Sequence, residues 1–534
     1  MQPLHIDGES LDLHDVVVVA RAGRPVALDP AARARMEASR AWVEQAATGE
    51  VRGPDGASLP VYGVNTGFGS LARIHLDGSQ ARALSWNLVQ SHAAGVGPMV
   101  PPDVTRAMML LRANALAKGA SGCRPALVET ILGMLDAGVV PEVPSRGSCG
   151  SSGDLAPLAH LGLVVFRAPE GEGDSGFAWM DGERMRGAEA MARAGLARLV
   201  PQQKEGLAMC NGSQLTTAWA ALACEDALGL LLGAEIAAGM SFEALRGVTR
   251  CLAPEVHALR PYRGSRQVAA DLARLLAGSE LTDSLPDKVQ DAYSLRCTPE
   301  VLGAVRDGLR YVRSQIRVEL NAATDNPLVL LELDDVNKAV SAGLFHGEPV
   351  GIAADHLKLV VSELAALSER RTYRLTTGSL SGRLPPSLVR EDRPGMGLMV
   401  PQATAAALVS ENRSLAWPAS VDSIPTCEDQ EDHVAMSTTA ARRAAEVVKN
   451  SRFVIAVELL AAASGLWWRQ SQEGITALGA GTRAALEVVE EAIGRGGLGC
   501  PSDEIAALEQ ALAAGTLQAA VQDAIGPLAG VDDV

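Results

Sequence analysis

Apolar residues recur at helical spacing through the middle of the chain. After Thr298-Pro299 they alternate at intervals of three and four residues, at Leu302, Val305, Leu309, Val312, Ile316 and Leu320. Residues three and four apart share one face of an α-helix, and a threonine followed by proline is typical of a helix start. A second stripe of apolar residues runs through Ile352, Leu357, Val360, Leu364 and Leu367, and a third follows Pro401. Successive striped helices predict a bundle whose inward side chains can build a site.

The regions on either side of this predicted bundle have a different pattern. Residues 1–200 combine short helical patterns with turns rich in glycine and proline, as at 144–157 and 168–176. Such loops often carry binding and catalytic residues. We therefore expect a mainly α protein with an N-terminal domain over 1–200 that shapes a site, a central helical bundle over 201–480, and short helices with an acidic end over 481–534.

Composition and charge narrow the fold class and the partners. Only 3% of the residues are aromatic, while alanine and leucine are abundant, which favours helices over strands. At 534 residues the chain is longer than one simple core usually holds. The net charge of −16 argues against nucleic acid or an anionic membrane as a partner. The longest apolar run, Ala227–Ala234, is far shorter than the roughly 18–20 residues that span a bilayer.

The eight cysteines are scattered without a CxxC pair, as is common for reduced cysteines of the cytosol. The N-terminus has no basic segment followed by an apolar stretch, so it does not look like a signal peptide. The nine histidines include no HExxH or comparable ligand set, and no nucleotide- or phosphate-binding loop is evident. We expect a cytoplasmic protein without a metal.

The segment Gly147–His160, GSCGSSGDLAPLAH, carries the clearest chemical signal. Its small residues allow backbone atoms to approach each other, and Asp154 is placed to cap a helix that begins at Leu155. A bare Ser-Ser-Gly tripeptide would usually be a loop entering a helix, with no chemistry of its own.

The tripeptide Ser151-Ser152-Gly153 can also form a ring from the backbone. Gly153 has no side chain, so its nitrogen can reach the carbonyl carbon of Ser151. Loss of water from Ser152 would then leave an exocyclic methylene conjugated with the new ring, which is an electrophile.

Six further segments extend the pattern over nearly the whole chain: YGVNTGFG (62–69), NLVQSHAAGVG (87–97), DKVQDAYSLRC (287–297), NAATDNP (321–327), FHGEP (345–349) and QEDHVAM (430–436). Together with GSCGSSGDLAPLAH, and in the same order, they resemble the histidine and aromatic amino-acid ammonia-lyases. In that family an Ala-Ser-Gly triad cyclises to 4-methylideneimidazol-5-one. The resemblance implies a mainly helical homotetramer whose cofactor is this ring, formed from Ser151-Ser152-Gly153 without an external cofactor.

One residue of the triad departs from the family. Ser151 stands where the family usually has alanine. Only the carbonyl carbon of this residue enters the ring, so its side chain lies outside the conjugated system. We expect the ring to form.

Elimination of ammonia from an α-amino acid requires that the amine be made a better leaving group and that a base remove a weakly acidic β-proton. The resemblance implies that the substrate amine attacks the electrophile and that Tyr62 is the base. A phenol with an ordinary pKa near 10 needs positive or hydrogen-bonding neighbours for this role. Arg296 resembles the family's carboxylate anchor, since a guanidinium binds carboxylate in a bidentate fork. Without the resemblance, an anchoring tyrosine and a surface ion pair would be the better interpretations.

Further family positions complete the expected site. Gln290, Tyr293 and Arg296 are spaced by three residues, so they can face one site if this stretch is helical. Asn211 and Phe345 match positions that contact the electrophile and the substrate in the family.

Two positions distinguish the substrates within the family. Ser91-His92 resembles the pair of histidine lyases, whereas phenylalanine lyases have Phe-Leu and tyrosine lyases His-Leu. Glu431 replaces the Gln of the phenylalanine and tyrosine enzymes. A carboxylate and a histidine suit an imidazole, which donates and accepts hydrogen bonds, while a benzene ring would leave the carboxylate unpaired. The resemblance thus implies conversion of L-histidine to trans-urocanate and ammonia, the first step of histidine degradation, at sites shared between subunits.

The nearest alternative shares the same chemistry, and two others belong to different classes of protein. A phenylalanine or tyrosine ammonia-lyase or a 2,3-aminomutase would use the same ring. Fumarase-type lyases are also helical tetramers, but they carry a GSSxMPxKxNP loop where this chain has GSSGDLAPLAH. A helical assembly protein without activity would be favoured only if Ser151 blocked ring formation.

The segment Cys427-Glu428-Asp429, just before QEDH, contains two extra acidic residues, which are expected to affect the pH dependence of the activity.

Overall fold

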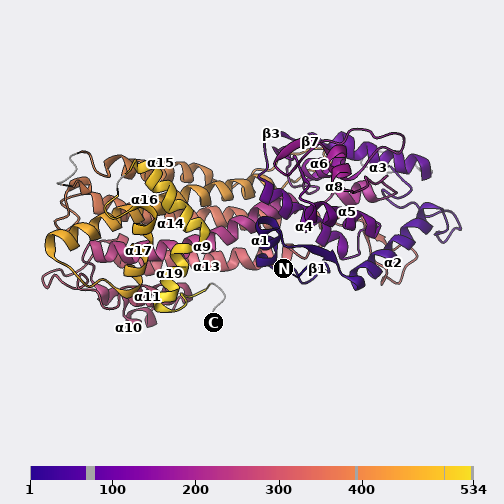
Figure 1. The fold of residues 1–534 in the computed structure, drawn as a ribbon. Helices are drawn as coiled ribbons and strands as arrows, with labels where there is room; N and C mark the ends of the chain where they lie inside the picture. The colour runs from indigo at the N-terminus through magenta and orange to yellow at the C-terminus, as the bar shows by residue number, and fades with distance from the viewer. Residues whose placement is uncertain (1, 68–77, 391–394, 498, 531–534) are drawn as a thin grey trace. The chain divides into compact units, whose positions relative to one another are not determined.

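The computed structural model describes residues 2–67, 78–390, 395–497 and 499–530 (Figure 1). The protein is mainly helical, as the sequence predicts. It divides into two compact units that alternate along the chain: the first holds 1–222, 314–355 and 418–442, and the second holds 223–313, 356–417 and 443–534. The three consecutive domains expected from the sequence remain a prediction.

The first unit contains short helices and very short strands. Its complete helices are α1 (Leu13–Ala22), α2 (Pro30–Ala47), α3 (Gly78–His92), α4 (Pro102–Ala117), α5 (Pro125–Asp136), α6 (Leu155–Val165), α7 (Gly187–Arg193) and α8 (Glu205–Cys210). The strands are β1 (Leu4–Ile6), β2 (Val26–Leu28), β3 (Val96–Met99), β4 (Val140–Pro141), β5 (Pro144–Arg146), β6 (Phe177–Met180), β7 (Glu183–Arg186), β8 (Leu328–Val329) and β9 (Ala339–Val340). They form small sheets, β1-β2 in parallel and β3-β5, β4-β6-β7 and β8-β9 antiparallel. With strands of two to four residues, packing between helices dominates the core.

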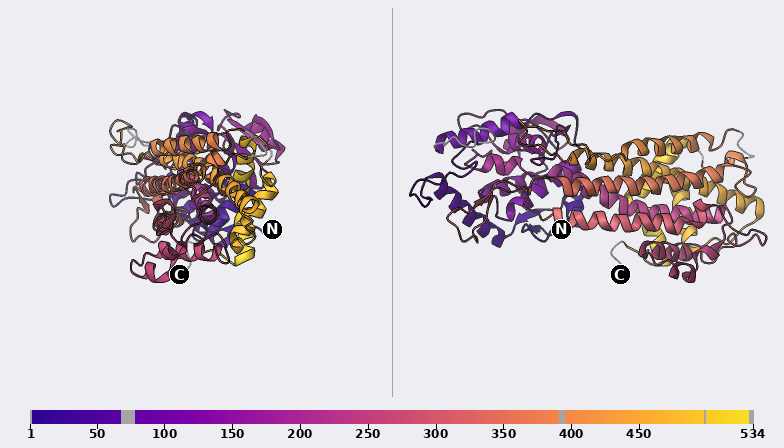
Figure 2. Two further views of the ribbon diagram at one scale, coloured as in Figure 1. Left: turned by 90° about the vertical axis from the view of Figure 1, so that its left-hand side faces the viewer. Right: turned by 180° about the vertical axis from the view of Figure 1, so that it is seen from behind.

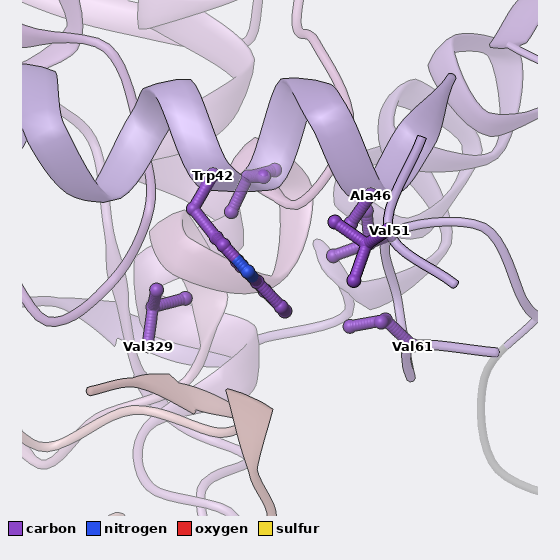
Figure 3. Close-up of a cluster of buried hydrophobic side chains, with 7 residues drawn as sticks. Trp42, Ala46, Val51, Val61 and Val329 are labelled. Carbon is purple, nitrogen blue, oxygen red and sulfur yellow. The ribbon is translucent and has the colours of Figure 1, made fainter. Parts of the chain in front are cut away.

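A hydrophobic cluster in this unit lies beside the segment of Tyr62. Trp42 and Ala46 extend from α2 toward Val51, Val61 and Val329 (Figure 3). Val43 and Val64 complete its buried members. Burial of these side chains fixes the two valines on either side of the Tyr62-Gly63 turn.

Hydrogen bonds from Asn65 secure the same turn. Its side-chain amide donates to the carbonyl of Ala46 at 3.1 Å and to that of Leu59 at 2.9 Å. Its side-chain oxygen accepts from the backbone N–H of Val61 at 2.7 Å. The backbone around the half-buried Tyr62 is thus held in place both by packing and by hydrogen bonds.

Four long helices carry the chain between the two units: α9 (Gln214–Ala244), α13 (Thr298–Glu319), α14 (Glu348–Thr376) and α16 (Ser437–Glu473). Within the second unit their segments run side by side as a bundle (Figures 1 and 2). The remaining helices of this unit are η2 (Thr249–Leu252), α10 (Pro254–Ala258), α11 (Arg263–Leu275), α12 (Tyr293–Arg296), η3 (Pro386–Leu388), α15 (Met399–Leu415), α17 (Ala480–Ile493), α18 (Pro501–Ala514) and α19 (Thr516–Ile525). The short helices predicted after 480 are present, and the acidic end at 531–534 lies outside the described residues.

The predicted apolar stripes largely coincide with buried faces. Every residue of the first stripe, from Leu302 to Leu320, is buried. In the second stripe Leu357, Val360 and Leu364 are buried, but Ile352 is 46% exposed, so its assignment to that face was wrong. Ile352 precedes Leu357 by five residues, and a step of five at 100° per residue leaves the face that steps of three and four maintain.

Buried ion pairs join the long helices within the second unit. The Glu458 carboxylate on α16 accepts from Arg371 of α14 at 2.8 Å and from the Ser241 hydroxyl of α9 at 2.7 Å. Arg306 of α13 pairs with Glu235 of α9 at 2.6 Å, and all four ionic side chains are fully buried. Because a buried charge is costly without its partner, these contacts restrict how the helices can be aligned.

Helix α16 is long and apolar enough to cross a membrane by length and composition, the one such helix in the described ranges. However, 78% of its most apolar 18-residue window is buried inside the protein. This burial is typical of a core helix.

Replacing Glu458 by alanine should destabilise the protein strongly. The change leaves the Arg371 guanidinium buried without its carboxylate, which typically costs about 3–5 kcal/mol. The free energy of unfolding from urea titration measures the effect. Glu183→Ala is the control, because it removes an exposed carboxylate that pairs with exposed Arg193 and should leave the unfolding midpoint unchanged. Equal effects of the two substitutions would contradict the assigned role of Glu458.

Candidate functional site

The segment predicted to form the ring passes very close to another stretch of backbone. Gly153 forms an isolated parallel bridge with Gly212, and the N–H of Asp154 donates to the Gly212 carbonyl at 2.6 Å. A Cβ atom on Gly153 would lie 2.4 Å from backbone atoms of Gly212, and the φ angle of Gly153 is +78°. Both constraints require glycine at this position.

Asp154 does not cap the helix that follows it, so this expectation was wrong. It occupies the N-cap position of α6, but its side chain makes no capping hydrogen bond there. Its buried carboxylate instead accepts from the backbone N–H of Thr216 at 2.8 Å, in the first turn of α9. The hydroxyls of Ser148, Thr216 and Thr438 donate to the same carboxylate at 2.7, 3.0 and 2.6 Å. Asp154 therefore caps α9 and ties the loop to the first turns of α9 and α16.

Glu431 contacts both serines of the triad. The Ser151 hydroxyl donates to Glu431 Oε2 at 2.6 Å, and the Ser152 hydroxyl donates to Oε1. The Thr426 hydroxyl also donates to Oε2, at 2.7 Å. The structure therefore joins the predicted electrophile to the residue expected to distinguish substrates, although they are about 280 positions apart.

Thr426 also contacts Glu431, although no motif of the sequence predicted this contact. It pairs with Glu431 through two backbone hydrogen bonds of 3.0 and 3.3 Å, closing a tight turn. Cys427, Glu428 and Asp429 within this turn all have positive φ angles, between 53° and 63°. Residues other than glycine rarely adopt this region, so the turn could not be predicted from these residue types.

The environment of Glu431 favours its charged form. Burial raises the pKa of this carboxyl, but hydrogen bonds from Ser151, Ser152, Thr426 and Cys427 outweigh burial and leave the pKa below its ordinary value. Glu431 is therefore a carboxylate near neutral pH.

His92 lies at the C-terminal end of α3 and within electrostatic reach of Glu431. Burial lowers the pKa of His92, while a hydrogen bond with the Leu88 carbonyl and the charge of Glu431 oppose the shift. The imidazole is therefore mainly neutral at pH 7. Its Nδ1 is 3.1 Å from the hydroxyl of Ser91.

The other predicted residues of the first unit occupy defined positions. Asn211 ends α8, where its carbonyl accepts from Arg112 at 2.6 Å and its side chain donates to the Asn326 carbonyl at 3.0 Å. Phe345 is half-buried in a turn before α14. Tyr62 comes directly after Val61, a buried member of the hydrophobic cluster in Figure 3. Residues 68 and 69 of the YGVNTGFG motif lie outside the described residues.

Gln290, Tyr293 and Arg296 belong to the second unit. Only Tyr293 and Arg296 share a helix, because α12 starts at Tyr293 and Gln290 precedes it in an irregular, exposed segment. The helical face expected for all three was therefore wrong for Gln290. The Arg296 guanidinium lies 4.7 Å from the centre of the Tyr293 ring, a cation–π contact, and Tyr293 is 70% exposed.

Comparisons with known proteins give the family. The sequence model of the aromatic amino acid lyases matches residues 11–491. A histidine ammonia-lyase of Anaeromyxobacter dehalogenans is 49% identical over 87% of this chain and 90% of its own length. The crystal structure of histidine ammonia-lyase from Trypanosoma cruzi superimposes with a TM-score of 0.88 at 34% identity, covering 98% of this chain and 96% of that one. The tyrosine aminomutase of Streptomyces globisporus gives the same TM-score at 33% identity, covering 98% and 99%. The chain belongs to the aromatic amino acid lyase family and is an enzyme.

Alanine substitutions at Gly153 and Gly138 separate the energetic cost of a steric clash from the cost of a left-handed backbone conformation. Both have positive φ angles, but a Cβ on Gly138 would meet nothing within 4 Å. Gly138→Ala should therefore cost only about 1–2 kcal/mol for the left-handed conformation. Gly153→Ala should cost about 1–3 kcal/mol more, because the backbone of Gly212 must move. Urea titration of both variants measures the difference, and equal losses would contradict the close approach.

Proposed function

We propose that this enzyme eliminates ammonia from L-histidine to give trans-urocanate, using a 4-methylideneimidazol-5-one formed from Ser151-Ser152-Gly153. One observation carries the proposal: the Glu431 carboxylate, the group expected to recognise an imidazole, is hydrogen-bonded to both serines of the triad. Relatives up to 49% identical that carry the name histidine ammonia-lyase support the same substrate.

The residues present fit the formation of such a ring. Gly153 is held against Gly212 where no side chain fits, which leaves its nitrogen unshielded by a Cβ. The methylene forms when Ser152 loses its α-proton and its hydroxyl together as water, and this hydroxyl is hydrogen-bonded to the Glu431 carboxylate. Once formed, the ring supplies an electrophilic carbon for the substrate amine.

Different side chains recognise different parts of the substrate in this proposal. Glu431 and His92, with Ser91 on His92 Nδ1, bind the imidazole through a charged acceptor and a neutral ring. Arg296 binds the carboxylate that every amino acid carries. Tyr62 removes the β-proton.

The remaining family positions complete the proposed site. Asn211 and Phe345 contact the electrophile and the substrate, and Gln290 and Tyr293 accompany Arg296. The hydrogen bond from the Asn211 amide to the Asn326 carbonyl fixes the orientation of that amide.

We also infer a cytoplasmic homotetramer in which subunits share sites. Tyr293, whose ring contacts the Arg296 guanidinium, is 70% exposed, and Val289 four residues earlier in the sequence is 91% exposed. Exposed large apolar side chains are typical of an interface. The eight cysteines, all within the described residues, form no disulfide bond, in keeping with a reducing compartment.

A phenylalanine or tyrosine lyase or aminomutase is the second candidate, because a tyrosine aminomutase matches the fold equally well. The charged Glu431 beside a neutral His92 favours imidazole over benzene, since an apolar ring leaves the carboxylate without a partner.

Ser152→Ala should fold but have no ring. Ring closure and the loss of the Ser152 hydroxyl each release one water molecule, so the parent should be lighter than its sequence by two water molecules and the variant should not show this loss. We expect urocanate formation to fall by about three orders of magnitude or more, as when a covalent catalytic group is removed. Intact-protein mass and urocanate absorbance measure the two effects.

Ser39→Ala is the control for this prediction, since the Ser39 hydroxyl donates only within its own helix, to the Met36 carbonyl. It should show the mass loss and parental turnover. Normal turnover by Ser152→Ala would refute the proposed mechanism.

Changing Ser91-His92 to Phe-Leu should alter the substrate ratio. The parent should turn over L-histidine far better than L-phenylalanine or L-tyrosine, because a site that hydrogen-bonds its substrate can reject analogues by roughly 10⁴–10⁵. The double variant loses a polar partner of the imidazole and gains apolar surface. Its kcat/KM for histidine should therefore fall, and the ratio of kcat/KM for phenylalanine to that for histidine should rise.

Arg296→Ala provides the comparison, because loss of the carboxylate anchor should weaken all three amino acids alike. The measurement is kcat/KM for each substrate. A histidine-to-phenylalanine ratio that stays fixed in the Ser91-His92 variant would contradict its role in selection.

A further inference from the structure

The Ser151 hydroxyl is a contact of Glu431 that lies outside the proposed ring. Ser151 is buried, with 6% of its surface exposed, and its hydroxyl donates to Glu431 Oε2 at 2.6 Å. Thr426 donates to the same oxygen at 2.7 Å, while Ser152 donates to Oε1. The two serines thus hold different oxygens of one carboxylate.

Ring formation changes this arrangement. In the proposed function Ser152 loses its hydroxyl, so Oε1 loses the donor seen here. Oε2 keeps the donors Ser151 and Thr426. Ser151 then provides the remaining hydroxyl contact between the triad and Glu431, and alanine at this position would provide none.

We propose that Ser151 is a positioning residue, whose hydroxyl holds the Glu431 carboxylate in place beside the electrophile. The inference rests on the proposed function, since it assigns Glu431 to the substrate. Two donors from different segments restrict rotation of the carboxylate, and hydrogen bonds to a charged group are strong. Ser151 thereby compensates for the donor that Ser152 gives up.

The charge of Glu431 should depend on this contact. The titratable groups that act with it are His92 on α3, Cys149 in the triad loop and Cys427 in the turn after Thr426. Burial raises the pKa of Glu431, and the hydroxyl of Ser151 is the first of the hydrogen bonds that lower it. Removing a donor that favours the charged form moves the pKa upward. The carboxylate of a Ser151→Ala variant is therefore neutralised at a higher pH as the pH falls.

Chemical labelling tests this shift without any turnover. A water-soluble carbodiimide couples protonated carboxyl groups to an amine, and tandem mass spectrometry separates Glu431 from Glu428, Asp429 and Asp432 nearby. In Ser151→Ala the labelling of Glu431 should begin at a higher pH than in the parent. Ser39→Ala should match the parent, and Thr426→Val should shift the onset in the same direction as Ser151→Ala.

A double-mutant cycle tests whether Ser151 acts through Glu431. Ser151→Ala should still lose two water molecules, lower kcat/KM for histidine about tenfold, and move the acidic limb of its pH profile to higher pH. In a Glu431→Gln background, which has no charge to hold, the same substitution should change kcat/KM by about twofold or less.

The outcomes separate this inference from the proposed function. Unchanged labelling of Glu431 together with an equal loss of kcat/KM in both backgrounds would overturn the role of Ser151. A failure of ring formation in Ser151→Ala would also overturn it, since Ser151 would then act on the ring. If the parent released ammonia from no amino acid, the proposed function would fail, yet the labelling shift would still show the Ser151–Glu431 contact.

Discussion

The buried carboxylate of Asp154 is the contact on which the geometry of the triad loop depends. It gathers four donors, one backbone N–H and three hydroxyls, from the loop itself and from the first turns of α9 and α16. Burial raises the pKa of Asp154, and these donors oppose that cost by stabilising its charged form. Immediately before it, Gly153 packs against Gly212 with no room for a side chain. The triad is thus fixed at one end by a satisfied buried charge and by direct backbone packing, which is the rigid support that the proposed ring would require.

A second carboxylate, that of Glu431, contacts the two serines of the same triad. Glu431 is reached from the triad by two hydroxyls and from its own turn by Thr426, and these contacts keep it charged despite partial burial. Its charge in turn acts on His92, whose imidazole burial keeps neutral. A charged acceptor and a neutral ring therefore lie within electrostatic reach of each other. Since Ser151 and Ser152 both belong to the triad, the proposed function would couple the electrophile and the recognition of the substrate side chain through a single residue, Glu431.

The sequence predicted the helical class, the family and most of the buried helix faces, because these follow from periodicity and from local motifs. Leu302 and Leu309 are buried as their spacing requires, whereas Ile352 lies off the predicted face because its spacing of five breaks the pattern. Contacts between distant segments were not predictable in this way. Asp154 has the residue type and position of a helix cap, but its partner Thr216 is 62 positions away. The turn that brings Thr426 to Glu431 contains three residues with positive φ angles, and none of them is a glycine that would have indicated the turn. Gln290 lies outside the helix, which starts only at Tyr293. The roles assigned to the site residues stay predictions.

The overall fold does not identify the substrate, because a histidine ammonia-lyase and a tyrosine aminomutase superimpose on this chain with the same TM-score. Discrimination must therefore come from a few side chains, and their energetics are asymmetric. An apolar pocket tolerates an imidazole with a modest loss, since the ring carries some of its water with it or leaves a hydrogen bond unmade. A pocket that contains a fixed carboxylate rejects a benzene ring more severely, because the charge loses its solvation and gains no partner. The hydroxyls that hold Glu431 in place increase this asymmetry, since a carboxylate held from two sides cannot turn away to find water. In the proposed function, the contacts that would make Glu431 a good acceptor for an imidazole would thus also make it a poor neighbour for phenylalanine.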